Sequence, residues 1–173
     1  GQMPKTFESG QLSVSSVFWA IDSWLQDCDP DLLADLLPPA SIRELQDMTD
    51  CLGQKLPYSF SELYLCHNGQ ASDRKRLLPG WYFMPLEGGG LRGAVEQYCS
   101  FKDVDGDTSD GFVKHMKCNT LWVPFATDFD HNFLALDLDP PQLGELEQVI
   151  CFGPHEKTRK IAGSLAEYLL NVA

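Results

Sequence analysis

The chain has 173 residues, of which 25 are acidic and 13 basic, and its formal net charge is −12. A field of this sign repels nucleic-acid phosphates and anionic lipids, which argues against either as a partner. Hydrophobic residues make up 43% of the chain, as in ordinary globular proteins. We expect one domain over residues 1–173, with residues 1–11 as a loosely ordered N-terminal segment.

Six cysteines are spread along the chain without a CxxC pair. The N-terminal sequence lacks the charged-then-apolar order of a signal peptide, and the apolar runs are too short to cross a bilayer. These features predict reduced thiols and a cytoplasmic protein.

The N-terminal part of the chain predicts helices. Apolar residues recur at helical spacing over residues 14–28, after the capping residue Ser13 and before Asp29-Pro30. One or two further turns are expected over residues 31–37, before Pro38-Pro39.

Two capping boxes follow. The box from Ser41 to Glu44 predicts a helix that ends at Gly53 in a left-handed conformation. A second box, from Ser59 to Glu62, predicts a short helix that ends at Asn68-Gly69, with positive φ at the glycine.

The second half of the chain contains mostly strand patterns. A strand is expected over residues 81–84, then a helix near residues 91–99 and a polar loop over residues 102–111. Three more strands (121–126, 132–138 and 148–152) and an amphipathic closing helix (161–172) complete the prediction. Short links between the strands favour antiparallel pairing, and the fold class is α+β.

Acidic residues alternate over residues 103–109, as at the start of a calcium-binding loop. Thr108 stands where that loop needs glycine, and Lys114 stands where it needs a bidentate glutamate. We therefore predict a solvated loop, and no metal or cofactor.

Two other groups of residues are candidates for catalysis. The adjacent Cys66 and His67 lie in a short helix, where packing explains them more simply than nucleophilic chemistry. The carboxylates between Asp128 and Asp139 suit acid–base hydrolysis only if burial raises one pKa, and we favour turn chemistry for them, with Asp128 and Asp130 in a hairpin loop and 137–141 at a strand end. We assign no catalytic residue and predict that the protein is not an enzyme.

An ordered set of short motifs resembles the SUKH superfamily. The motifs are Leu37-Pro38, Leu52-Gly53, Leu56-Pro57, His67-Asn68-Gly69-Gln70, the run 122–126 and the run 133–137. The resemblance covers nearly the whole chain and implies a mixed, largely antiparallel central sheet with helices packed around it. It departs from the family at Phe129-Asp130-His131, where glycines are expected.

The resemblance also implies a function. Bacterial members of the superfamily are often immunity proteins that neutralise a toxin, and fungal members regulate cell-wall synthesis and signalling. We expect a non-catalytic protein-binding domain, with a toxin inhibitor as the first hypothesis, a signalling or cell-wall regulatory adaptor as the alternative, and a carboxylate-dependent hydrolase as a third. The expected partner is a basic protein, such as a toxin domain, and the expected contact residues are Asp103, Asp105, Asp107, Asp110, Asp128, Asp130 and Asp139.

Overall fold

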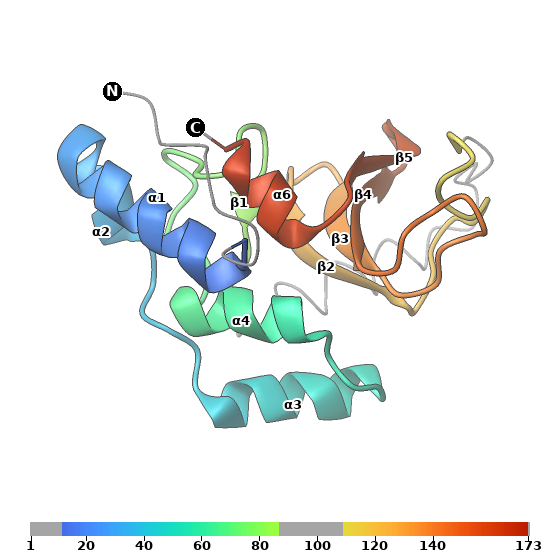
Figure 1. The fold of residues 1–173 in the computed structure, drawn as a ribbon, viewed down its shortest axis with the longest axis horizontal. Helices are drawn as coiled ribbons and strands as arrows, with labels where there is room; N and C mark the ends of the chain where they lie inside the picture. Colours follow the sequence, from blue (N-terminus) through green and yellow to red (C-terminus); the bar gives the residue numbers. More distant parts are fainter. Residues whose placement is uncertain (1–11, 87–108, 173) are drawn as a thin grey trace.

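The computed structural model describes residues 12–86 and 109–172, in which helices pack around an antiparallel sheet (Figure 1). The α+β class predicted from the sequence is confirmed. The helices are α1 (Val14–Cys28), α2 (Pro30–Asp35), α3 (Ile42–Leu52), α4 (Tyr58–Cys66) and α6 (Leu165–Leu170). The strands are β1 (Tyr82–Phe83), β2 (Trp122–Thr127), β3 (Phe133–Asp137), β4 (Gln148–Gly153) and β5 (Glu156–Ala162).

The sheet has the order β1-β2-β3-β4-β5, and each neighbouring pair is antiparallel, as the short links predicted. Strands β2 and β3 are buried along their whole length, so both of their faces are covered. In Figure 1, α1 to α4 gather to one side of the sheet, and α6 lies between α1 and the end formed by β4 and β5.

The closing helix was predicted too long. Ile161, which was assigned to it, lies in β5, and the helix begins only after Ser164, whose hydroxyl accepts a hydrogen bond from Glu167 N. Strand β5 is polar because it pairs with β4 on one side only and buries little more than Thr158. Such an edge strand lacks the apolar alternation by which strands are recognised in a sequence.

The cap predicted for α3 is confirmed, and the cap predicted for α4 is wrong. Ser41 and Glu44 form the reciprocal capping box, and Gly53 ends α3 with φ of 69°. Helix α4 starts after Pro57 without a side-chain cap. The hydroxyl of Ser59 instead donates to Glu147 Oε1, 3.3 Å away in the β3–β4 loop, so a tertiary contact replaces the local one.

The segment 67–70 joins the helices to the sheet edge. Asn68 Nδ2 donates to Glu44 Oε2, and Asn68 Oδ1 accepts from Leu86 N. Gly69 has φ of 77°, as predicted, although α4 itself already ends at Cys66. Gln70 is fully buried, and its backbone N–H donates to Phe83 O. These motif residues therefore have structural roles.

The helix predicted near residues 91–99 lies outside the described residues. No helix within residues 12–86 and 109–172 is long and apolar enough to cross a membrane.

Candidate functional site

The turn between β2 and β3, residues 128–132, holds two non-glycine residues at positive φ. Phe129 has φ of 66° and His131 has φ of 65°, where the family resemblance had led us to expect glycines. A bulky residue in this conformation is strained, and it persists only where its surroundings hold it in place.

Side-chain hydrogen bonds hold this turn. Asp128 Oδ1 accepts from Asp130 N and Asn132 N, at 2.8 and 3.2 Å, and Asp128 Oδ2 accepts from Asn132 Nδ2 at 2.8 Å. The Thr127 hydroxyl oxygen accepts from Phe129 N, and Asn132 Oδ1 accepts from His155 N. The carboxylate of Asp128 thus serves the turn chemistry that the sequence suggested.

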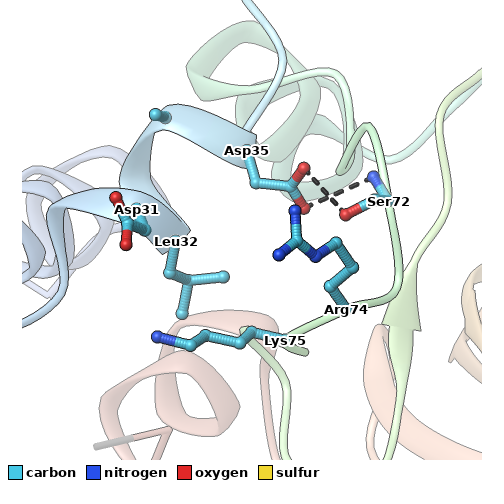
Figure 2. Close-up of a pocket in the computed structure, with 7 residues that line it drawn as sticks. Asp31, Leu32, Asp35, Ser72, Arg74 and Lys75 are labelled. Carbon is cyan, nitrogen blue, oxygen red and sulfur yellow. Dashed lines mark hydrogen bonds between the residues drawn. The ribbon is translucent and has the colours of Figure 1, made fainter.

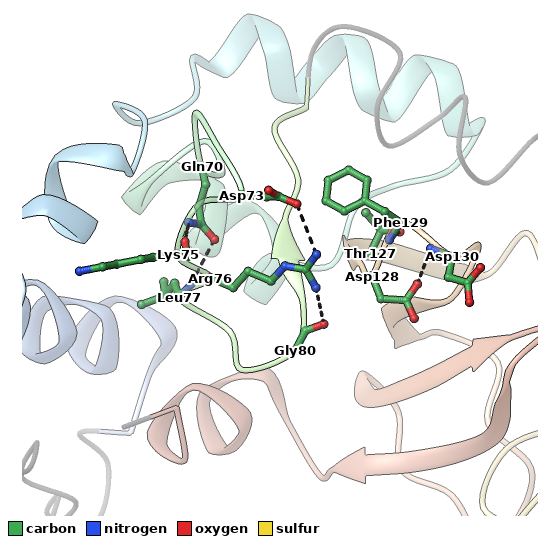
Figure 3. Close-up of polar contacts among 10 residues, drawn as sticks. All are labelled: Gln70, Asp73, Lys75, Arg76, Leu77, Gly80, Thr127, Asp128, Phe129 and Asp130. Carbon is green, nitrogen blue, oxygen red and sulfur yellow. Dashed lines mark hydrogen bonds and ion pairs between the residues drawn. The ribbon is translucent and has the colours of Figure 1, made fainter.

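The turn presents an aromatic ring to solvent. Phe129 is 59% exposed and stacks on Tyr82, with 5.0 Å between ring centroids. The Arg76 guanidinium lies 5.6 Å from the centre of the Phe129 ring, close enough for a cation–π contact. Figure 3 shows that guanidinium held between Asp73 and Gly80 O, at 3.3 and 2.9 Å. We call Asp73, Arg76, Tyr82, Phe129 and Asp130 the Phe129 surface.

The acidic residues predicted to bind a partner are dispersed. Asp130 is exposed beside Phe129, and its carboxylate is 3.7 Å from the exposed His155. Asp110 binds backbone N–H groups of Phe112 and Lys160, and Asp139 pairs with Lys114 at 2.7 Å. The structure therefore brings Asp128 and Asp130 together and uses Asp110 and Asp139 as loop anchors. Asp103, Asp105 and Asp107 lie outside the described residues.

Two of the carboxylates that the hydrolase hypothesis uses, Asp137 and Asp139, have structural partners. Asp137 is fully buried, and burial raises its pKa. Its two oxygens accept from Asp139 N and Gln148 Nε2, at 2.8 and 2.9 Å. Asp139 is held by Lys114, whose hydrogen bond lowers the pKa of its carboxyl. Through these contacts both side chains stabilise the segment that follows β3.

Cys66 and His67 do not form a nucleophile–base pair. Burial raises the pKa of the Cys66 thiol to about 11, so it is protonated at neutral pH. The His67 ring points elsewhere: Nδ1 donates to Leu37 O at 2.8 Å, and Nε2 donates to Asp22 at 3.0 Å. Burial lowers the pKa of His67, but the contacts with Asp22 and Leu37 outweigh it and the net pKa is raised.

Sequence reasoning missed Tyr82, Arg76 and Phe129 as surface residues. The only signal was the departure at residues 129–131, where bulky residues replace expected glycines in a turn. A residue that accepts backbone strain and still leaves its ring in solvent is a candidate contact residue.

The described residues thus form an α+β fold whose polar motif residues build the scaffold and whose β2–β3 turn carries an exposed aromatic ring. A family model described as the SMI1/KNR4 family (SUKH-1) matches residues 39–171. The chain belongs to that family, and the resemblance to the SUKH superfamily is confirmed.

Three curated relatives are fungal proteins. The chain is 26% identical, over 92% of its length, to the cell wall biosynthesis/cell cycle regulator smi1 of Schizosaccharomyces pombe. It is 25% identical, over 91% of its length, to KNR4/SMI1 homolog 2 of Debaryomyces hansenii, and 24% identical, over 93%, to the KNR4/SMI1 homolog of Yarrowia lipolytica. The chain spans about a third of the length of these relatives, at 35%, 34% and 30% respectively.

Proposed function

We propose that this chain is a non-catalytic protein-binding domain with a regulatory role, and that it contacts its partner through the Phe129 surface. The observation that carries the proposal is the β2–β3 turn, in which hydrogen bonds hold Phe129 at positive φ with 59% of the residue exposed. Exposed aromatic and arginine side chains are the groups that most often dominate protein interfaces.

The Phe129 surface is suited to binding because little of it must be ordered on contact. Tyr82 stacks on one part of the Phe129 ring, and Arg76 is already held by Asp73 and Gly80 O. Immobilising a free side chain on binding costs about 0.5–1.5 kcal/mol. A ring and a guanidinium that are held before contact avoid much of this cost.

The surrounding charge favours a basic partner. The net charge of −12 supplies a long-range attraction, and Asp130 adds an exposed carboxylate beside Phe129. Complementary charge acts mainly on the association rate. Asp110, Asp128 and Asp139 contribute to this field while they hold loops, and Asp103, Asp105 and Asp107 complete the acidic set in the proposal.

Two protein-binding roles are candidates for this chain: a regulatory adaptor and a toxin inhibitor. The fission-yeast relative is named as a regulator of cell-wall biosynthesis and the cell cycle, which favours the regulatory adaptor over the toxin inhibitor that was the first hypothesis. The inhibitor is the second candidate, supported by the acidic balance, because a basic nuclease-type toxin would be attracted in the same way. The free thiols of Cys66, Cys118 and Cys151 suit the cytoplasmic location that we propose for either role.

A comparison of two surface variants tests the proposal. Affinity purification from the source organism, with quantitative mass spectrometry, would compare the wild type with Phe129→Ser and with Tyr58→Ser, a 78% exposed aromatic on α4. We expect a partner that is lost with Phe129→Ser, retained with Tyr58→Ser, and chemically unchanged after incubation with the domain.

Identical partners for all three proteins would refute the Phe129 surface, and a partner modified by the domain would refute the non-catalytic role. A partner that is toxic alone, is encoded beside this gene and is neutralised by the domain would favour the inhibitor over the adaptor.

A further inference from the structure

A second feature of the loop that carries Arg76 is a pocket on its other side. The pocket has a volume of about 490 Å³ and lies between α2 and residues 72–75. Figure 2 shows Asp31 and Leu32 of α2 on one wall and Arg74 and Lys75 on the other. The volume lies within the range of small-ligand sites, but the lining is largely charged, which suits a polar group rather than an apolar one.

Hydrogen bonds hold the two walls of the pocket together. Asp35 accepts from both the backbone N–H and the hydroxyl of Ser72, at 3.3 and 3.0 Å. Ala71 N donates to Asp35 O at 2.8 Å. The buried Gln70 donates to Lys75 O and accepts from Leu77 N. The pocket is therefore shaped before any ligand arrives.

The three consecutive cations of this loop differ in what they contact. Lys75 pairs with Asp29 at 3.1 Å, and this hydrogen bond lowers the pKa of Asp29. Arg76 pairs with Asp73. Arg74 lines the pocket and makes no ion pair or hydrogen bond in the part of the chain that the structure describes. A guanidinium without an internal anion, in a chain of net charge −12, is available to an external one.

We propose that this pocket binds the side-chain carboxylate of an acidic residue on an extended segment of a protein partner. Arg74 supplies paired N–H donors that match the two carboxylate oxygens, and Leu32 contacts the methylene groups of the bound side chain. Asp31 and Asp35 line the same pocket, so a doubly charged phosphate is repelled more strongly than a single carboxylate.

The inference rests on the proposed protein-binding function and adds to it. A pocket that holds one guanidinium without an ion pair, on an otherwise acidic protein, selects a partner by orientation, because the partner's acidic residue must reach Arg74 and avoid Asp31 and Asp35. The Phe129 surface then supplies apolar contact on the opposite side of the same loop.

A titration with short peptides tests the pocket without the natural partner. The uniformly ¹⁵N-labelled full chain would be titrated with the terminally blocked pentapeptide Gly-Leu-Glu-Leu-Gly, and amide shifts would be followed. Two matched peptides carry glutamine or phosphoserine in place of glutamate. The variants are Arg74→Gln and, as the control, Arg43→Gln, which removes an exposed arginine on α3.

We expect the glutamate peptide to shift signals of residues 31–35 and 72–75 and to bind about tenfold or more tightly than the glutamine peptide, as a charge-assisted hydrogen bond provides. Arg74→Gln should abolish that preference and Arg43→Gln should keep it. Equal binding of the two peptides, shifts elsewhere, or equal loss in both variants would overturn the pocket. Tighter binding of the phosphoserine peptide would overturn its assignment to a carboxylate. None of these outcomes depends on Phe129. A negative result would therefore refute the Arg74 pocket without refuting the protein-binding proposal, which the Phe129→Ser comparison tests.

Discussion

Replacing Gly69 with alanine should destabilise the fold far more than the same change at Gly53. Both glycines have positive φ, 77° and 69°. A Cβ atom at Gly69 would lie 2.5 Å from Pro85 N and 2.6 Å from the carbonyl carbon of Met84, whereas a Cβ atom at Gly53 has no heavy atom within 4 Å. The two substitutions share the backbone strain and differ in the contact.

The difference can be estimated from the hydrogen bonds beside Gly69. Strain at positive φ costs about 1–2 kcal/mol at either position. The Gly69 contact is with backbone, so residues 67–70 and 83–86 must separate, which weakens Leu86 N–H to Asn68 Oδ1 and Gln70 N–H to Phe83 O. At about 1 kcal/mol for each bond, Gly69→Ala should lose about 3–4 kcal/mol and Gly53→Ala about 1–2 kcal/mol.

Urea unfolding followed by tryptophan fluorescence would measure both losses, and an unchanged slope would show that the two-state comparison holds. A difference of about 2 kcal/mol corresponds to about 4–8 °C in Tm for a chain of this size. If both variants lose the same free energy, the close packing of Gly69 against Pro85 does not restrain the fold and the argument is wrong.

Three further outcomes are expected. The hydrogen bond with Asp22 raises the folded-state pKa of His67, so protonated His67 stabilises the fold fully below the unfolded pKa of about 6.5, and this stabilisation is lost as pH rises through the folded pKa. Asp22→Asn should make the free energy of unfolding nearly independent of pH across this window. A wild-type profile that is already flat there would contradict the ion pair. Asn132→Ala should cost about 2–3 kcal/mol in urea unfolding, because it removes the buried amide that donates to Asp128 Oδ2 and accepts from His155 N; a loss below about 0.5 kcal/mol would show that the backbone hydrogen bonds of Asp128 are enough to hold the turn. Asp130→Lys should slow association with a basic partner at low salt and have little effect at 1 M salt, where the screening length is about 3 Å; a salt-independent effect measured by stopped flow would argue for a direct contact instead of steering.

The parts of the fold that could be predicted are those specified by local sequence. Strands β2, β3 and β4 are short apolar runs between turns, and the Ser41 box specifies the start of α3 within one turn. Strand β5 was missed because its pairing with β4, and not its own composition, makes it a strand. Likewise Ser59 carries the pattern of a cap, but Pro57 and the contact with Glu147 decide where α4 begins.

The candidate site was less predictable than the fold. Asp128 and Asp130 were placed in a hairpin turn from their spacing, and the turn is there. Arg76 and Tyr82 lie near each other in the chain but far from Phe129, and the pairing of β1 with β2 brings Tyr82 beside Phe129. The contact between these residues depends on strand pairing, which the sequence alone does not specify.

The motif His67-Asn68-Gly69-Gln70, one of those by which the family is recognised, explains why family membership does not identify the partner. Gln70, the last residue of that motif, is buried and holds the loop from Lys75 to Leu77 by two hydrogen bonds. Arg74 precedes this loop and Arg76 lies on it, and neither of these residues, which we assign to partner contacts, takes part in the hydrogen bonds of Gln70. Arg74 can therefore change without loss of the scaffold, since surface substitutions away from structural contacts usually alter stability by less than about 0.5 kcal/mol, and a change of Arg76 removes only its contacts with Asp73, Gly80 O and the Phe129 ring. The same frame can present a different set of charges to a different protein, so the partner must be sought from Phe129 and Arg74 and not from the motif.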